Sequence, residues 1–124
     1  MNMRMKVFTL TVSAFLLVSA FGLVREQDPT EVDAKHYKVV FENEHVRVLR
    51  ITYGPGEKSV MHEHPDAVAV FLTDNSVRMT MPDGSTEEIA GKAGDAAWYE
   101  AIKHLPENLA DTPMEVILVE LKGK

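Results

Sequence analysis

From Tyr37 onward the chain alternates hydrophobic and polar residues in short runs that are separated by turn-forming residues. Such period-two runs predict β-strands, because successive side chains of a strand point to opposite faces of a sheet. The even spacing of these runs predicts an all-β sandwich or barrel. The predicted strands are Tyr37–Glu42, Val46–Tyr53, Lys58–His64, Val68–Thr73, Val77–Met81, Thr86–Ala90, Asp95–Tyr99 and Met114–Leu121.

The N-terminal part of the chain has a different pattern. Arg4 and Lys6 precede Val7–Val24, a run that carries no charge and is mostly apolar. A basic start followed by an apolar run with small residues near its end predicts a secretory signal. We therefore expect residues 1–22 to be a signal peptide and the mature protein to be exported, either to the periplasm or out of the cell. An uncleaved membrane anchor is the alternative, because the run just reaches the length that spans a bilayer.

Composition narrows the function classes. The formal net charge is −6, and cleavage of the signal would remove two positive charges, Arg4 and Lys6, to leave −8. An acidic chain lacks the cationic surface that phosphate groups require, so we expect no nucleic-acid partner. The chain has no cysteine, which excludes disulfides and thiol chemistry. Residues 23–35 are polar and predict a linker, which leaves 36–124 as one folded domain.

Two histidines one residue apart, His62 and His64, lie at the end of a predicted strand. Residues i and i+2 of a strand face the same way, so both imidazoles point to one site. This arrangement favours metal binding, because two buried imidazoles side by side are costly without a ligand to hold them. His104 follows another strand-like run and is the candidate third ligand. For His36 and His45 we expect ordinary packed or surface roles.

Two separated motifs resemble those of the cupin family. The stretch GEKSVMHEH, Gly56 to His64, resembles the first half of the first cupin motif, a glycine followed by five residues and H-x-H. The stretch GDAAWYEAIKHLPEN, Gly94 to Asn108, resembles the second motif. The resemblance covers about Tyr37 to Leu121 and is strongest to short exported cupins. It implies a single cupin-type jelly-roll β-barrel, also called a double-stranded β-helix, of two antiparallel sheets.

The chain departs from the cupin pattern in two places. Cupins commonly carry a glutamate ligand four or five residues after H-x-H, and those positions here hold Val68 and Ala69. The proline and glycine of the usual turn in the second motif are replaced by Glu100 and Ile102. Glu100 is expected to be a solvated loop residue, although it is also a candidate to approach the site.

The resemblance therefore implies a metal site made of three neutral histidines, His62, His64 and His104. Three neutral ligands leave coordination positions open for water, substrate or dioxygen. This set resembles the three-histidine iron centres of some cupin-type dioxygenases. It suits tetrahedral zinc equally well. The sequence does not choose between iron, manganese, nickel, copper and zinc.

Two function hypotheses follow from the motifs. The leading one is an exported cupin that binds one divalent metal ion and a small chelating ligand, with dioxygenase-like chemistry as the reaction class. The alternative is a non-catalytic binding module for a metal or small ligand, and a structural barrel without metal is a third possibility. The predicted pocket walls are Val68, Val70, Met79 and Met81, with one of Trp98 and Tyr99 and contributions from Phe71 and Tyr53.

Homodimerisation is an expectation from analogy with small cupins. The hairpin around Glu42–Arg50 offers an edge strand for such pairing. Its charged residues would also protect that edge from indiscriminate pairing, because charges discourage an edge strand from recruiting another chain. The charges in question are those of Glu42, Glu44, Arg47 and Arg50.

Overall fold

The structure, a computed structural model, describes residues 27–123, so the predicted signal peptide lies outside the described residues. The described part folds into one short helix and nine strands. Their bounds are α1 Pro29–Val32, β1 Tyr37–Glu42, β2 Val46–Tyr53, β3 His62–His64, β4 Ala67–Phe71, β5 Asn75–Thr80, β6 Thr86–Gly91, β7 Ala96–Tyr99, β8 Ile102–Asn108 and β9 Met114–Leu121. The bounds of β1, β2 and β9 agree with the predicted ones.

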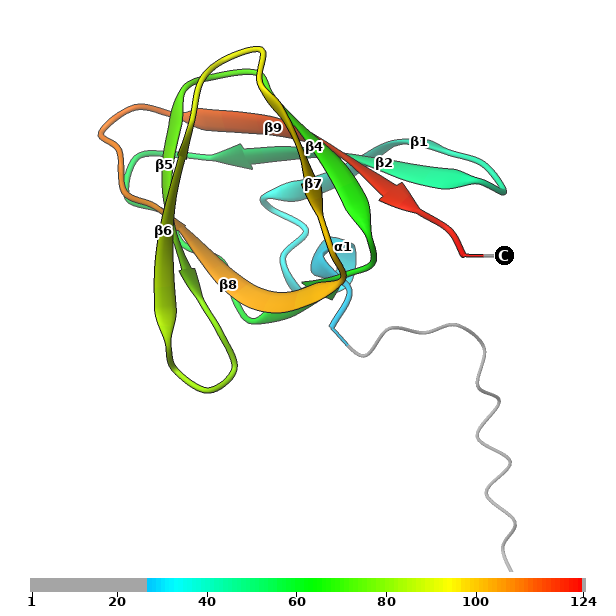
Figure 1. The fold of residues 1–124 in the computed structure, drawn as a ribbon, viewed down its shortest axis with the longest axis horizontal. Coiled ribbons are helices and arrows are strands. Elements are labelled where there is room, and N and C mark those ends of the chain that lie inside the picture. Colours follow the sequence, from blue (N-terminus) through cyan, green and yellow to red (C-terminus); the bar gives the residue numbers. More distant parts are fainter. Residues whose placement is uncertain (1–26, 124) are drawn as a thin grey trace, which may run out of the picture.

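The strands form two sheets that face each other and enclose a barrel (Figure 1). One sheet has the order β1-β2-β9-β4-β7 and the other the order β3-β8-β5-β6. Neighbouring strands run antiparallel throughout the described pairings. Because strands far apart in sequence pair with one another, the chain crosses repeatedly between the two sheets. The predicted all-β barrel is confirmed.

Strand β8 carries His104, and the hydrophobic pattern did not predict it as a strand. The reason is Pro106 in its centre, since proline lacks the N–H that a sheet ladder uses. In the structure β3 pairs only with the part of β8 that ends at His104, so Pro106 lies beyond this ladder. The carbonyl of Pro106 still accepts a hydrogen bond from the backbone N–H of Ser59. The proline is therefore tolerated, and β8 joins β3 to β5.

The inward face of β4 differs from the expected one. Its buried residues are Ala67 and Ala69, whereas Val68 and Val70 are only partly buried. Side-chain parity would carry over from His64 only if β3 and β4 continued in one sheet, but they belong to different sheets. The connection between β3 and β4 therefore changes which side chains of β4 point inward. Two small side chains on the inward face leave room inside the barrel.

The hydrophobic core lies between the two sheets and draws mainly on β2 and β9. Their inward positions alternate with partly buried or exposed ones, as expected for strands with one buried face. The buried hydrophobic residues are Tyr37, Leu49, Ile51, Tyr53, Ala67, Ala69, Val77, Met114, Val116 and Leu118. This core fixes β9 in the centre of the larger sheet, where it supports the histidine-bearing strands.

The composition of residues 23–35 predicts a linker, but the described part of this range lies against the barrel. Asp28 caps α1 by accepting a hydrogen bond from the backbone N–H of Thr30. The carbonyl of Gln27 accepts a hydrogen bond from Glu63 of β3, and Pro29 is buried. The segment therefore braces the strand that carries the histidine pair. Within residues 27–123, no helix has the length and apolar character needed to cross a membrane.

Candidate metal centre

The three predicted histidines come together at one end of the barrel. His62 of β3 lies opposite His104 of β8 in the strand pairing, and His64 is two residues further along β3. All three are buried, and His62 is completely so. The ring centroids are 4.8 Å apart for His62 and His64, 5.0 Å for His62 and His104, and 5.3 Å for His64 and His104. One ring nitrogen from each lies within 4.8 Å of the others.

Hydrogen bonds on the outer side of two rings determine which nitrogen carries the proton. The Nδ1 of His62 donates to the carbonyl oxygen of Val60 at 2.8 Å. The Nδ1 of His64 donates to a carboxylate oxygen of Glu120 at 2.7 Å. A neutral imidazole has one donor and one acceptor nitrogen, so the Nε2 of each ring keeps a free lone pair.

The inward nitrogens fit a shared metal ion. The Nε2 atoms of His62 and His64 are 3.0 Å apart, which is unfavourable for two lone pairs with no proton or cation between them. Two nitrogens bound to one ion at about 2.1 Å lie about 3.0 to 3.4 Å apart. The Nε2 of His104 is buried and has no hydrogen-bond partner among the described residues. The donor set therefore matches a metal site, and the three histidines could hold a metal ion.

The environment keeps two of these rings neutral. Burial, together with the neighbouring His64 ring, lowers the pKa of His62 to about 4. Burial and then the His64 and His62 rings lower the pKa of His104 to about 3. Both rings are thus unprotonated at neutral pH, and the neutral imidazole is the form that binds metals.

Glu120 supports His64 from behind and is itself held by charge. Its second carboxylate oxygen accepts from Arg47 Nε at 2.7 Å, and the Arg47 guanidinium also pairs with both oxygens of Asp28. Burial acts to raise the pKa of Glu120, but the hydrogen bonds from His64 and Arg47 outweigh it and lower the pKa. An ionised carboxylate on Nδ1 fixes the orientation of a ligating histidine and raises its basicity.

Sequence reasoning missed this supporting chain of Glu120, Arg47 and Asp28. One signal was present: in the strand MEVILVEL, Glu120 occupies an inward position that alternation assigns to a hydrophobic residue. Arg47 was expected to be a charge that protects an exposed edge. The structure instead places β2 between β1 and β9, and the Arg47 side chain is only 13% exposed.

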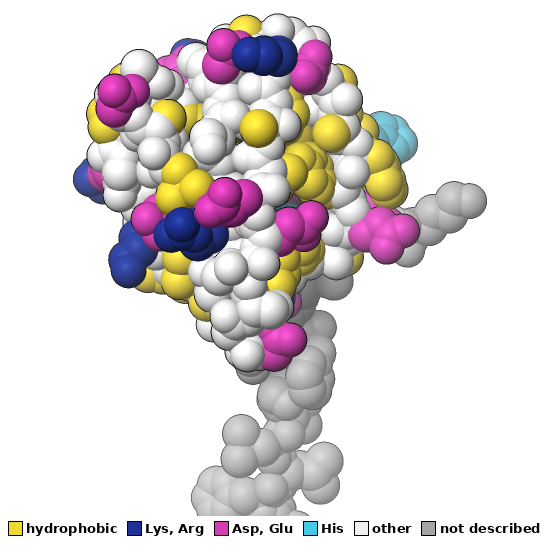
Figure 2. Space-filling model, turned by 60° about the vertical axis from the view of Figure 1, so that its left-hand side comes forward, with side chains coloured by type: hydrophobic (Ala, Val, Ile, Leu, Met, Phe, Trp, Pro, Cys, Tyr) yellow, Lys and Arg dark blue, Asp and Glu magenta, His cyan; other side chains and the backbone are white. Residues whose placement is uncertain are grey.

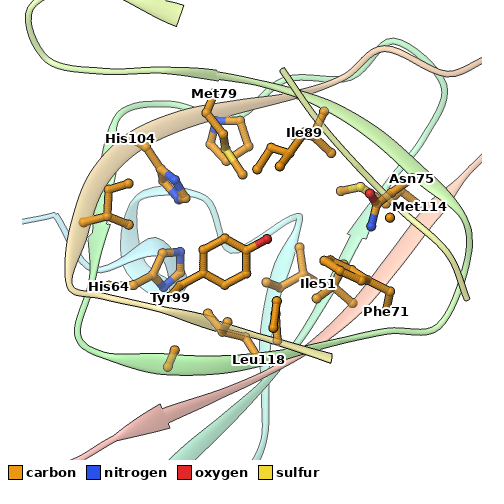
Figure 3. A pocket seen from close by; sticks show the side chains of 18 of the residues that line it. Ile51, His64, Phe71, Asn75, Met79, Ile89, Tyr99, His104, Met114 and Leu118 are labelled. Atoms are coloured by element: carbon orange, nitrogen blue, oxygen red, sulfur yellow. The ribbon is translucent and has the colours of Figure 1, made fainter. Parts of the chain in front are cut away.

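A cavity of about 410 Å³ extends from the histidines through the barrel between the sheets (Figure 3). His64 and His104 lie at one end, and Phe71, Asn75 and Met114 lie at the other. Most of its wall is apolar. The cavity is lined by Tyr37, Ile51, Tyr53, His64, Pro65, Ala67, Ala69, Phe71, Asn75, Val77, Met79, Ile89, Ala90, Gly91, Asp95, Ala96, Ala97, Tyr99, Glu100, Ile102, His104, Pro106, Met114, Val116 and Leu118.

The wall differs in part from the predicted one. Met79 lines the cavity as predicted, but Val68 and Val70 do not, because the parity of β4 is reset. Met81 also does not, because it follows the end of β5 in a turn where its N–H bonds to Ser85. Phe71 and Tyr53 both contribute to the wall, as expected.

Strand parity predicted that only one of Trp98 and Tyr99, at the end of β7, lines the cavity, and the structure shows that this residue is Tyr99. Trp98 is 53% exposed on the opposite face. The hydroxyl of Tyr99 points into the cavity (Figure 3). Burial, with a smaller contribution from Glu87, raises the pKa of Tyr99, so its hydroxyl stays a proton donor at neutral pH. Tyr99 thus adds a polar group between the two ends.

The other histidines have the expected roles. His36 is buried but satisfied: its ring stacks on Tyr53 with centroids 4.3 Å apart, and its Nδ1 bonds to Asp33. His45 is exposed beside Glu44. Neither belongs to the three-histidine cluster, although Asp33, which bonds His36, also accepts a hydrogen bond from Ser59 beside His62.

The remaining motif residues shape turns. Gly56 and Gly94 adopt φ values of 69° and 89°, where side chains are strained and glycine is favoured. Asn108 is completely buried, and its amide bonds to three backbone groups, so it anchors the loop after β8. Glu100 lines the cavity and is exposed, while Ala69 lines it without offering a ligand atom.

Comparison with solved structures places this architecture among the cupins. A cupin domain from Bordetella pertussis Tohama I has 26% sequence identity and a TM-score of 0.65, over 70% of this chain and 92% of that chain. An RmlC-like cupin with a double-stranded β-helix fold from Methanocaldococcus jannaschii has 15% identity and a TM-score of 0.53, over 68% and 77%. The polyketide cyclase RemF from Streptomyces resistomycificus has 16% identity and a TM-score of 0.51, over 68% and 63%.

No family model and no curated protein matches the sequence. The structural similarity nevertheless extends over most of the described chain and includes cupins from distant organisms. The fold is a cupin-type double-stranded β-helix. The chain has the fold of small cupin-domain proteins, in agreement with the resemblance of its two sequence motifs.

Proposed function

We propose that this chain binds one divalent metal ion through His62, His64 and His104 and holds the chelating end of a small, largely apolar ligand at that ion. One observation carries the proposal. Three buried histidine nitrogens converge at the polar end of an otherwise apolar cavity, and His104 Nε2 has no partner among the described residues. Such convergence of a few polar groups in an apolar cavity is typical of ligand sites.

The chain's own residues prepare this site. Glu120 orients His64, and the Val60 carbonyl orients His62, so two lone pairs face one point before any ligand arrives. The apolar walls exclude water and strengthen electrostatic interactions at the histidine end. When bound there, a divalent ion supplies Lewis acidity toward a ligand oxygen. Tyr99 offers a protonated hydroxyl inside the cavity to donate to the same ligand.

Dioxygenase-like oxidation of the bound ligand is the reaction class that we propose. Three neutral ligands leave the charge of a divalent ion uncompensated, which favours a chelating ligand that carries negative charge on oxygen. The enclosed apolar cavity would hold the rest of such a ligand away from water. The polyketide cyclase among the similar structures is a precedent for an enzyme on this fold, and it supports catalysis only by analogy of fold.

Non-catalytic ligand binding is the second candidate function. The positions that commonly supply a glutamate ligand in cupins hold Val68 and Ala69, and neither side chain can bind a metal. A site without that carboxylate still binds a chelating ligand, so binding and turnover must be measured separately.

The test uses the metal-free full chain loaded separately with iron(II), cobalt(II) and zinc(II). We expect catechol, a simple chelating probe, to change the visible spectrum of the cobalt-loaded protein, and the iron-loaded protein to consume oxygen with catechol. The exposed His45 provides a matched control, because His45→Ala should behave as wild type whereas His64→Ala should not. Spectral change without oxygen consumption would favour the binder, and an unchanged spectrum in wild type would overturn the proposal.

A further inference from the structure

Asn75 places an unpaired polar group at the end of the cavity opposite the histidines. Its side chain reaches the cavity at that end (Figure 3) and is only 9% exposed. The amide nitrogen, Nδ2, is buried and has no hydrogen-bond partner among the described residues. A buried donor without an acceptor costs free energy, so an acceptor is expected where this group faces the cavity.

The fold holds Asn75 firmly in this place. It is the first residue of β5 and pairs with Gly91 of β6. A Cβ atom added at Gly91 would lie 2.9 Å from the Phe71 ring and 3.2 Å from the side-chain oxygen of Asn75. Glycine at position 91 therefore lets the Asn75 amide and the Phe71 ring lie against β6. The amide is thus a fixed feature of the cavity wall.

The two polar ends are separated by an apolar stretch of strand. Val77 and Met79 occupy the next inward positions of β5 and lie opposite Asn108 and Pro106 of β8. His104 lies two residues beyond Pro106, so about six residues along the strands separate it from Asn75. At about 3.3 Å per residue this is at most about 20 Å of backbone. A ligand that reaches both ends must therefore be elongated and largely apolar in its middle, where Tyr99 adds a hydroxyl.

The charged side chains that line the cavity indicate which kind of ligand oxygen would accept a hydrogen bond from Asn75. Among the described residues that line the cavity there is no lysine or arginine, and the two charged side chains, Asp95 and Glu100, are acidic. The outer surface seen in Figure 2, by contrast, carries lysine and arginine beside acidic and hydrophobic side chains. A carboxylate or phosphate at this end would lose its hydration without gaining a cation, which is costly. An uncharged oxygen needs only the one donor that Asn75 provides.

We infer that the cavity takes an elongated, two-ended ligand, with a chelating group at the histidines, an apolar middle, and an uncharged carbonyl, ether or hydroxyl oxygen that accepts from Asn75 Nδ2. This inference rests on the proposed metal function for the chelating end. It goes further by assigning Asn75 as the residue that selects the far end of the ligand. The residue is a binding and specificity determinant rather than a catalytic one.

The test is calorimetric titration of the metal-loaded full chain with matched probes. The probes are 4-substituted catechols of increasing chain length, each ending either in a methyl ketone or in the isosteric isopropenyl group. In wild type we expect one chain length at which the ketone binds about tenfold tighter than its hydrocarbon partner, because only the ketone accepts a hydrogen bond. Asn75→Leu removes the donor at similar size and should abolish this preference without changing metal content or the affinity for unsubstituted catechol.

The outcomes separate the two proposals. If wild type binds metal and catechol but never prefers a ketone, or if Asn75→Leu keeps the preference, the Asn75 assignment is wrong while the metal site stands. If wild type takes up no metal, the proposed function fails and the two-ended ligand fails with it. The comparison of ketone and hydrocarbon in wild type decides the question even if Asn75→Leu does not fold, and Asn75→Ala, which also lacks the donor, provides a second variant.

Discussion

The two ends of the cavity differ in how the chain satisfies their polar atoms. At the histidine end, Val60 and Glu120 engage the outer nitrogens of His62 and His64, and only inward nitrogens are left. At the far end, Asn75 alone presents a donor that no described residue engages. The chain itself therefore builds and orients the histidine end, whereas only a ligand that enters the cavity can complete the far end.

The largest expected effect concerns the histidine end without metal. The folded-state pKa of His104, about 3, lies below the 6.5 of the unfolded chain, so the unfolded state binds more protons between these values. The free energy of unfolding should therefore fall as the pH drops from 6.5, by on the order of 2 kcal/mol by pH 4.5 for this group. Denaturant unfolding of the metal-free chain in chelator at several pH values measures this.

A matched variant separates the contribution of His104 from that of the carboxylates, which titrate in the same pH range. His104→Gln is neutral at every pH, so its unfolding free energy should depend less steeply on pH than that of wild type. Equal slopes in the two proteins would show that His104 is not held neutral by burial.

The next effect tests the support behind the metal end. Glu120→Gln keeps the shape but removes the charge that holds His64, and loss of such a partner typically weakens metal affinity about 10- to 100-fold. Glu115→Gln is the control, because Glu115 forms an ion pair with Arg50 on the same two strands but more exposed to solvent. Competition against a metal indicator measures both. Equal affinities in the two variants would contradict a role for Glu120 at the site.

Tyr99 tests the region between the two ends. Tyr99→Phe removes the hydroxyl that points into the cavity and should weaken binding of catechol by up to about tenfold, the range of one hydrogen bond. Metal content should stay as in wild type, since Tyr99 is outside the histidine cluster. Calorimetry gives the affinity. Unchanged catechol binding would place the ligand away from Tyr99.

The smallest expected effect tests whether the Asn75 amide lacks a hydrogen-bond partner in the ligand-free protein. Asn75→Leu removes a buried donor without a partner, so the ligand-free protein should gain up to about 1 kcal/mol in unfolding free energy. Asn108→Leu is the matched contrast, because that buried amide bonds to Gly54, Thr112 and Ala110 and its loss leaves them unpaired. We expect the opposite sign there. Destabilisation of both to a similar extent would mean that Asn75 is satisfied in the free protein.

Local pattern was sufficient to predict most strands and to pair His62 with His64, whereas His104 joined them through the resemblance of the second motif. Alternation located β1, β2 and β9, and the spacing of His62 and His64 placed two rings on one face. These features depend only on neighbours in sequence. The same parity argument predicted that only one of Trp98 and Tyr99 faces inward, but it did not choose between them.

The missed features depend on contacts between distant parts of the chain. Pro106 concealed β8, whose place is set by pairing with β3 and β5. Asn75 follows Asp74 in what the sequence indicates is a turn, because both residues favour turns, yet it begins a buried strand. Glu120 and Arg47 are 73 residues apart, and no local period joins them.

Elemental analysis is the direct test of the proposed three-histidine metal site. The full chain is purified without chelator or histidine tag, beside His62→Ala/His104→Ala and the control His45→Ala. We expect about one metal ion per chain in wild type and in the control, and almost none in the double variant. A wild type that stays metal-free after exposure to iron, manganese and zinc, or a double variant that keeps its metal, would contradict the proposed site.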